Sequence, residues 1–283
     1  MSQSLEVTTD SAEAEAAAGL TTARETGGAV VVYGDFACPW SYLAARRADV
    51  LEAAGLLIDW RAVEAGDRVP WLPHVRQRRL AAVREQMPHV LAALLPDEVL
   101  PYSLVGAVPF SRAACSAYAE AYAAGVAANV RQLLFRAFWM HGFDLDDGNA
   151  LRTLLIDRLL DSDSPSHVVA EWGMVPDAAG GPISTAAWRL ARAWRSQWET
   201  VSSTQTPLVV VGGHHLYGAR AAAWLGTQTT RRGLEPNLLP QLATTARPVA
   251  EYPHISWVTQ NGGRWLRDAS RDRSHLPWDR RPR

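Results

Sequence analysis

The feature that most constrains the fold is a strand, a helix and a second strand predicted in succession within residues 29–65. The first segment, AVVVYGDF (29–36), is the β-branched and aromatic run typical of a buried strand. The segment PWSYLAARRADVLEAAG then has apolar residues at helical spacing and reaches Gly55, which favours a helix end, before the strand-like LLIDWRAVEA. A helix of this length joins neighbouring parallel strands through a right-handed crossover. The fold is therefore expected to begin with a βαβ unit.

The middle of the chain changes character and is predicted to be helical. Its strongest helical stretch is SRAACSAYAEAYAAGVAANVRQLLFRAFWMHG (111–142), preceded by an expected break at Pro88. The amphipathic segments NALRTLLIDRLLDS and STAAWRLARAWRSQWET follow it. Strand signals return in TPLVVVGGHHLYG, where a Gly-Gly turn joins two short runs as a β-hairpin. The segment ARAAAWLGTQ then predicts a closing helix. The two ends thus supply one α/β domain, and the middle is an insertion.

Five segments follow from this pattern. They are a flexible acidic tail at 1–28, a βαβ half at 29–67, an all-helical insertion at 68–204, a ββα half at 205–228 and an Arg-, Trp- and Pro-rich extension at 229–283. The extension is interpreted either as a surface-wrapping or partly disordered tail, or as a segment that Trp257, Trp265 and Trp278 anchor on this protein or on a second subunit. The second interpretation leaves a homodimer possible.

Composition restricts the kinds of partner. The 283 residues carry a formal net charge of −1, which gives no electrostatic reason to expect nucleic acid or an anionic membrane as a partner. The N-terminus lacks the apolar core of a signal peptide, and no apolar run is long enough to cross a bilayer. Two cysteines cannot form the disulfide framework of a secreted scaffold, so the expected compartment is the cytoplasm. All 28 basic residues are Arg, and alanine is abundant, which suggests a high-GC bacterial genome.

Cys38 is the residue best placed for chemistry. It lies between the first strand and the following helix, and Pro39 suits the first position of that helix. Unpaired backbone N–H groups and the positive end of the helix dipole favour thiolate over thiol at such a position. We therefore expect a reactive thiolate, against the alternative that Cys38 is a small buried apolar residue.

Three segments of the sequence resemble one family. The stretch DFACPWSYLA (35–44) is similar to the active-site loop of the DsbA-like branch of the thioredoxin superfamily, which includes FrnE-type oxidoreductases and 2-hydroxychromene-2-carboxylate isomerases. TQTPLVVVGGHHLYGARAAAWL (205–226) resembles the later motif of that family, and residues from VPFSRAACSAYAEAYAAG to DLDDGNALRTLL resemble its helical insertion. The resemblance covers roughly residues 29–228 and implies a thioredoxin-like α/β fold with a large helical insertion.

The resemblance also implies roles for individual residues. Cys38 matches the nucleophilic cysteine, and Pro39 and Trp40 match the dipeptide that follows it. Pro207 matches a cis-proline beside the cysteine, where the backbone of Thr206 would pair with a bound thiol or peptide. Without the resemblance, a trans proline at the start of a strand would be expected at this position.

The sequence departs from this pattern at Ser41, which stands where the oxidoreductases place the resolving cysteine. Ser41 cannot release an adduct formed on Cys38, so a thiol from solution must do so. The interpretation is a monothiol oxidoreductase with no permanently bound cofactor or metal. Its co-substrate would be a small thiol, glutathione or an analogue such as mycothiol, and its substrate a small-molecule or protein disulfide. The alternatives are a small-thiol-dependent isomerase or transferase, in which Ser41 helps bind a cofactor thiolate, and a non-catalytic binding domain.

Other polar residues are assigned mainly structural roles. Cys115 lies in an alanine-rich helix and is interpreted as a core residue rather than a resolving thiol. Asp35 either raises the pKa of Cys38 or binds backbone amides of its loop. Adjacent histidines on a strand point to opposite faces, so His214 and His215 cannot easily share a metal. Two sets remain: arginines at 76, 78, 79 and 84, which form a solvated face or attract an acidic substrate, and Asp146 or Asp147, which caps the helix near Ala150.

Overall fold

The computed structural model describes residues 29–65, 73–103, 108–160, 176, 180–201 and 205–237. Within them lie four strands and seven helices: β1 Val30–Gly34, α2 Pro39–Ala53, β2 Ile58–Ala62, α3 Pro73–Ala92, α4 Arg112–Ala123, α5 Ala127–His141, α6 Gly148–Leu160, α8 Thr185–Thr200, β3 Leu208–Val211, β4 His214–Tyr217 and α9 Gly218–Arg231. The predicted tail at 1–28 and the extension beyond residue 237, with its three tryptophans, lie outside the described residues. No described helix has both the length and the apolar character needed to span a membrane.

The four strands form one mixed sheet in the order β2-β1-β3-β4. β1 and β2 are parallel, with Val32 opposite Trp60, whereas β3 runs antiparallel to both β1 and β4. Gly212 and Gly213 join β3 to β4 with φ values of 54° and 80°, a left-handed geometry that glycine adopts without steric cost. The predicted α/β class, the βαβ unit and the hairpin are therefore confirmed.

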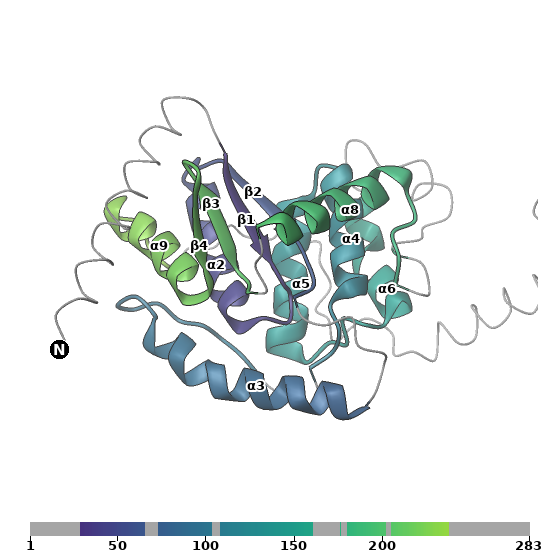
Figure 1. Ribbon diagram of the computed structural model, residues 1–283, viewed down its shortest axis with the longest axis horizontal. Helices are drawn as coiled ribbons and strands as arrows, with labels where there is room; N and C mark the ends of the chain where they lie inside the picture. Colours follow the sequence, from purple (N-terminus) through teal and green to yellow (C-terminus); the bar gives the residue numbers. More distant parts are fainter. Residues whose placement is uncertain are drawn as a thin grey trace, which may run out of the picture. The chain divides into compact units, whose positions relative to one another are not determined.

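Helices cover both sides of the sheet (Figure 1). α2 and α9 pack against each other, and Figure 1 shows α9 on the opposite side of the strands from α4, α6 and α8. An aromatic core lies between the sheet and the helical insertion. In it Phe36 contacts Tyr118 and Phe135, and Tyr42 stacks on Trp139 with 5.3 Å between the ring centroids. This packing anchors the start of α2, where Cys38 lies, against the buried core.

α2 is further held by buried ion pairs. The Arg47 guanidinium bonds to both oxygens of Glu98, at 2.9 and 2.6 Å, and to the Ala222 carbonyl of α9 at 2.7 Å. Arg131 of α5 pairs with Asp49 of α2. Buried charges are tolerated only when paired in this way, so these contacts fix α2 relative to its neighbours.

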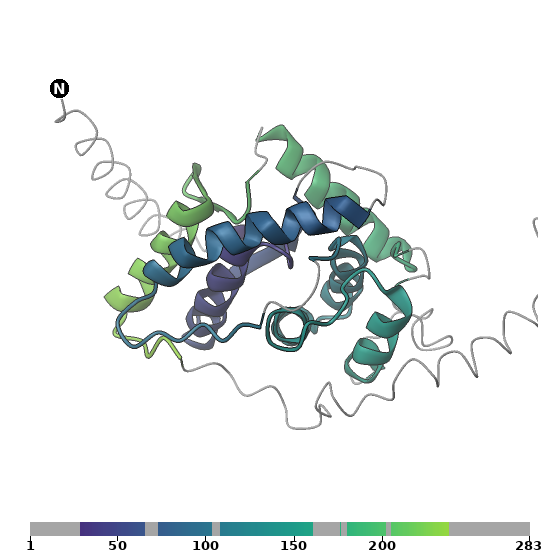
Figure 2. The ribbon, with the colours of Figure 1, turned by 90° about the horizontal axis from the view of Figure 1, so that it is seen from below.

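α3 differs from the prediction because it continues through Pro88, where a break was expected. A proline inside a helix removes one backbone hydrogen bond and disturbs the preceding turn. On both sides of it, however, Met87 and Val90 are buried, with 3% and 0% of their surfaces exposed. Their packing keeps the last turn helical. Figures 1 and 2 show that α3 runs across one end of the sheet, apart from the other helices of the insertion.

The stretch 111–142, predicted as the strongest helical segment, is two helices rather than one. α4 ends at Ala123 and α5 begins at Ala127, with Gly125 between them at a φ of 79°. A glycine in this conformation terminates a helix. The alanine-rich periodicity on both sides obscured the break. Farther along, Asp147 caps α6, since its Oδ1 accepts hydrogen bonds from the backbone N–H groups of Asn149 and Ala150 at 2.9 and 3.0 Å.

Candidate active site

Cys38 lies at the N-terminus of α2, where the sheet topology brings it beside the start of β3. It is the N-cap residue, in an extended conformation, and Pro39 begins the helix. Because β1 and β3 pair with Tyr33 opposite Leu208, the residues before β3 lie next to the loop that follows β1. The Cys38 thiol donates a hydrogen bond to the Thr206 carbonyl at 3.2 Å, and the Thr206–Pro207 peptide bond is cis.

Ser41 and Asp35 support this loop from inside. Ser41 is fully buried, and its Oγ accepts a hydrogen bond from the Asp35 backbone N–H at 3.2 Å. The Asp35 carboxylate accepts three hydrogen bonds, from the N–H groups of Ala37 and Ala65 at 2.9 and 2.8 Å and from the Ser111 hydroxyl at 2.6 Å. Asp35 therefore joins the β1–α2 loop to the segment after β2 and to the start of α4. Binding of backbone amides was one of the two roles expected for it from the sequence.

The expected stabilisation of the Cys38 thiolate is not found in this conformation. Burial raises the pKa of the Cys38 thiol, and the nearby Asp35 carboxylate raises it further. Hydrogen bonding with the side chains of Thr206 and Ser41 and with the backbone N–H of Ser41 lowers the pKa, but by less than burial raises it. In the thiol form, the sulfur donates a hydrogen bond to the Thr206 carbonyl. The position at the helix start favours the thiolate, but burial of the sulfur outweighs that effect.

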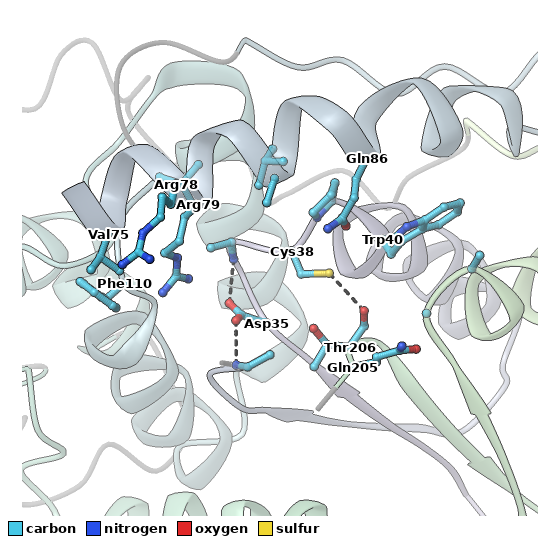
Figure 3. A pocket seen from close by; sticks show the side chains of 18 residues that line it. Asp35, Cys38, Trp40, Val75, Arg78, Arg79, Gln86, Phe110, Gln205 and Thr206 are labelled. Carbon is cyan, nitrogen blue, oxygen red and sulfur yellow. Dashed lines mark hydrogen bonds between the residues drawn. The ribbon is translucent and has the colours of Figure 1, made fainter. Parts of the chain in front are cut away.

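A cavity of about 710 Å³ opens beside Cys38 (Figure 3). This volume lies in the range of sites for small organic ligands. Its wall is formed by Asp35 and residues 37–40, by one face of α3, by Val108 and Phe110 before α4, and by residues 205–206 with Gly218 and Ala219. Of the predicted site residues, Cys38, Pro39, Trp40 and Thr206 line the cavity. Ser41 and Pro207 are buried behind the wall.

α3 supplies a wall of the site that the sequence indicated only through its arginines, as one of their two expected roles. Its cavity-lining residues are Val75, Arg78, Arg79, Ala82, Val83 and Gln86. Their spacing of three and four places them on one helical face. The helical periodicity was visible in the sequence, but only the folded chain shows that this face lies opposite Cys38.

The arginines of α3 have different surroundings. Arg76 is bound to Asp144 and Asp146, with its shortest contact at 2.8 Å to Asp146. Arg79 lies over the Phe110 ring, 4.9 Å from its centroid, and its distance to the Glu64 carboxylate is 3.9 Å. Arg78 and Arg79 border the cavity, whereas Arg84 does not. The four arginines considered together in the sequence are thus separated by the fold.

The remaining candidates stand apart from the cavity wall. Cys115 is buried in α4, and burial, followed by the charges of Asp35 and Glu64, raises its pKa well above that of an ordinary thiol. His214 and His215 lie side by side along β4. Among the described residues, no group of three or more His, Cys, Asp or Glu side chains is arranged to hold a metal ion.

Comparison with known proteins identifies one family. Residues 29–171 match the model of the DSBA-like thioredoxin domain. The match ends before the segment 205–226, so the position of Thr206 and Pro207 beside Cys38 is a finding of the structure. A search of curated proteins finds no match to the chain.

Several solved structures are similar in outline. A probable DsbA oxidoreductase from Streptomyces coelicolor is 20% identical, with a TM-score of 0.49, covering 72% of this chain and 89% of that one. A 2-hydroxychromene-2-carboxylate isomerase is 19% identical, with a TM-score of 0.47 and coverages of 72% and 95%. The cytosolic disulfide reductase DsbM from Pseudomonas aeruginosa is 18% identical, with a TM-score of 0.47 and coverages of 72% and 98%. These likenesses are distant, and the family assignment rests on the family model.

Proposed function

Because the chain belongs to the DSBA-like thioredoxin domain family, we propose that it is a monothiol thiol–disulfide oxidoreductase in which Cys38 exchanges with disulfides or small-thiol adducts. The observation that carries this proposal is the position of the Cys38 thiol. It is half-buried in the wall of the cavity, bonded to Thr206, and Ser41 occupies the position one helical turn further on. The other cysteine, Cys115, is buried in α4.

The proposed exchange has two steps. The Cys38 thiolate attacks one sulfur of a disulfide R–S–S–R, which forms Cys38–S–S–R and releases RS⁻. A small thiolate R′S⁻ from solution then attacks the sulfur of the bound R group, which releases R–S–S–R′ and restores the Cys38 thiolate. In a second round, Cys38 attacks the R′ sulfur of R–S–S–R′ and releases the remaining RS⁻, and another R′S⁻ removes the bound R′ group. Net reduction of the disulfide therefore consumes two equivalents of the small thiol, which leave as R′–S–S–R′. The small thiol, glutathione or an analogue such as mycothiol, is thus a co-substrate, and a reducing compartment, the cytoplasm, would supply it.

Thr206 has a specific part in this proposal. In the free protein its carbonyl accepts the Cys38 S–H, which favours the protonated form. A substrate N–H that bonds to the same carbonyl would compete for that acceptor. Substrate binding would then remove one interaction that holds Cys38 as a thiol, and Pro39 and Trp40 would border the bound disulfide.

Adduct mass spectrometry tests the proposal. Full-length protein incubated with oxidised glutathione, or with the disulfide of another small thiol, is expected to gain one adduct at Cys38 that added thiol removes. The Cys38→Ser variant is expected to gain none. Absence of any adduct on the wild-type protein would refute the oxidoreductase and would support a non-catalytic binding domain.

The size of the cavity favours a second candidate, a small-thiol-dependent isomerase or transferase. The space beside Cys38 is large enough for an organic molecule together with part of a thiol. Against this candidate, Ser41 is fully buried and does not reach the cavity wall. Activity on an organic substrate that persists in Cys38→Ser protein and requires added thiol would decide in its favour.

A further inference from the structure

The cavity beside Cys38 has two chemically different ends (Figure 3). Figure 3 shows Arg78 and Arg79 with Val75 and Phe110 on one side of Cys38, and Gln86 with Trp40 on the other. Along α3 the arginines and Gln86 are separated by about 11 Å, at roughly 1.5 Å per residue. A ligand bound through its sulfur near Cys38 can therefore place another group at the arginine end.

At the arginine end, one guanidinium group has no ionic partner among the described residues. Arg78 forms no hydrogen bond, ion pair or ring contact with any part of the chain that the structure describes, whereas Arg76, close by on the same helix, is neutralised by two aspartates. Arg79 is 3.9 Å from Glu64, and Glu64 already accepts a hydrogen bond from the Ser111 N–H at 3.0 Å. The Glu64 carboxylate is thus shared between Arg79 and the Ser111 N–H, and its contact with Arg79 is long.

The carboxylate that lines this wall, Asp35, does not pair with either arginine. Asp35 lines the cavity, but Ala37, Ala65 and Ser111 occupy its oxygens with three hydrogen bonds. Its charge also acts on the Cys38 sulfur, which disfavours an anionic group next to the reacting atom. A carboxylate is favoured only at a distance from the ligand sulfur, on the arginine side.

We infer that Arg78 and Arg79 form a carboxylate subsite, which makes the site prefer acidic small-molecule thiols and disulfides over neutral ones. The stacking of Arg79 on Phe110 orients its guanidinium, so that the planar group can present paired N–H donors to a carboxylate. Arg78, which has no ionic partner among the described residues, matches a single carboxylate. This inference deepens the proposed function, on which it rests, by naming the chemical class of its small substrate.

Exchange rates with two matched probes test the subsite. 5,5′-Dithiobis(2-nitrobenzoate) carries a carboxylate on each ring, whereas 4,4′-dithiodipyridine is neutral. The Arg78→Gln/Arg79→Gln variant is expected to react at least about tenfold more slowly with the first probe, as for loss of a charge-assisted hydrogen bond. Its rate with the second probe should change by less than about twofold, within the range of surface substitutions.

Arg84→Gln is the matched control, because Arg84 lies on the same helix but not at the cavity. It should leave both rates unchanged. Equal slowing with both probes in the double variant, or the same selective loss in Arg84→Gln, would overturn the subsite. Subtracting the rate of Cys38→Ser protein removes any contribution of Cys115.

A binding measurement separates this inference from the proposed function. S-methylglutathione and its diethyl ester have no exchangeable sulfur and differ in their carboxylates. Calorimetric titration of the wild-type protein is expected to show tighter binding of the free acid, and the double variant should lose this preference. Equal affinity for both in the wild type would refute the subsite, whether or not Cys38 exchanges. A failure of the adduct experiment alone would refute only the exchange.

Discussion

The two cysteines have similar electrostatics and different access. Burial raises the pKa of both thiols, and the Asp35 charge raises both further. Cys38, however, is an N-cap residue in a cavity wall, whereas Cys115 is 8% exposed inside α4. The comparison teaches that the fold distinguishes a candidate nucleophile from a core thiol by access and by nearby helix-end donors. An unusually acidic thiol is not what marks the site.

Substitution of each cysteine separately gives the largest expected effect. Cys38→Ser should abolish adduct formation, because a hydroxyl cannot form a disulfide. Cys115→Ala should leave the adduct yield unchanged while lowering the free energy of unfolding by about 1 kcal/mol, through loss of a small buried group. Mass spectrometry and denaturant titration measure the two outcomes. An adduct on Cys115 would contradict the assignment of access to Cys38.

Placing a thiol behind Cys38 sharpens the comparison. In Ser41→Cys protein the introduced thiol lies one turn along α2 and should displace a bound small thiol, forming an intramolecular disulfide with Cys38. The adduct lifetime without added thiol should shorten at least about 100-fold, since the reaction becomes intramolecular. Ser41→Ala protein is the control and should retain the long-lived adduct. Equal adduct lifetimes in the wild-type, Ser41→Cys and Ser41→Ala proteins would show that Ser41 does not occupy the resolving position.

The pH dependence of alkylation tests the electrostatic part. Cys38 should be alkylated with a midpoint above the roughly 8.5 of a free thiol. Asp35→Asn should lower that midpoint, because it removes a charge that opposes the thiolate, although loss of a buried acceptor should cost about 1–3 kcal/mol of stability.

Glu64→Gln provides the matched control for that substitution. Glu64 raises the pKa of Cys115 and is not among the main causes that act on Cys38, so the Cys38 midpoint should change less than in Asp35→Asn protein. A midpoint for wild-type Cys38 below that of a free thiol would mean that the helix end outweighs burial.

The smallest expected effect is on stability at alkaline pH. The folded-state pKa of Cys115 lies above its unfolded value, so above about pH 8.5 the unfolded chain loses a proton that the folded chain keeps. The free energy of unfolding should then fall as pH rises, by at most about 1.4 kcal/mol per pH unit for this group. Cys115→Ala should flatten this slope in urea titrations at pH values of about 8 to 10, which bracket the pKa of a free thiol. An unchanged slope would place Cys115 in a more polar environment.

Much of the fold could be predicted from the sequence, because strands, helix starts and tight turns depend on residues that are close together in the chain. The strand before Cys38, the helix after it and the Gly-Gly hairpin each follow from residues close in sequence. Pro88 and Gly125 were misjudged for opposite reasons. Burial of Met87 and Val90 holds α3 together across a proline, whereas the alanine-rich periodicity of 111–142 hid a glycine that ends α4.

The sequence by itself determined the position of Cys38 at a helix start, the presence of Ser41 three residues after it, and the order of the strands along the chain. Only the tertiary structure decided that Thr206 accepts the thiol hydrogen bond, that burial outweighs the helix end, and that α3 supplies the opposite wall. The reason is physical. Helix ends and turns are set by contacts within a few residues, whereas a pKa and a cavity depend on groups that are distant in sequence and meet only in the folded chain.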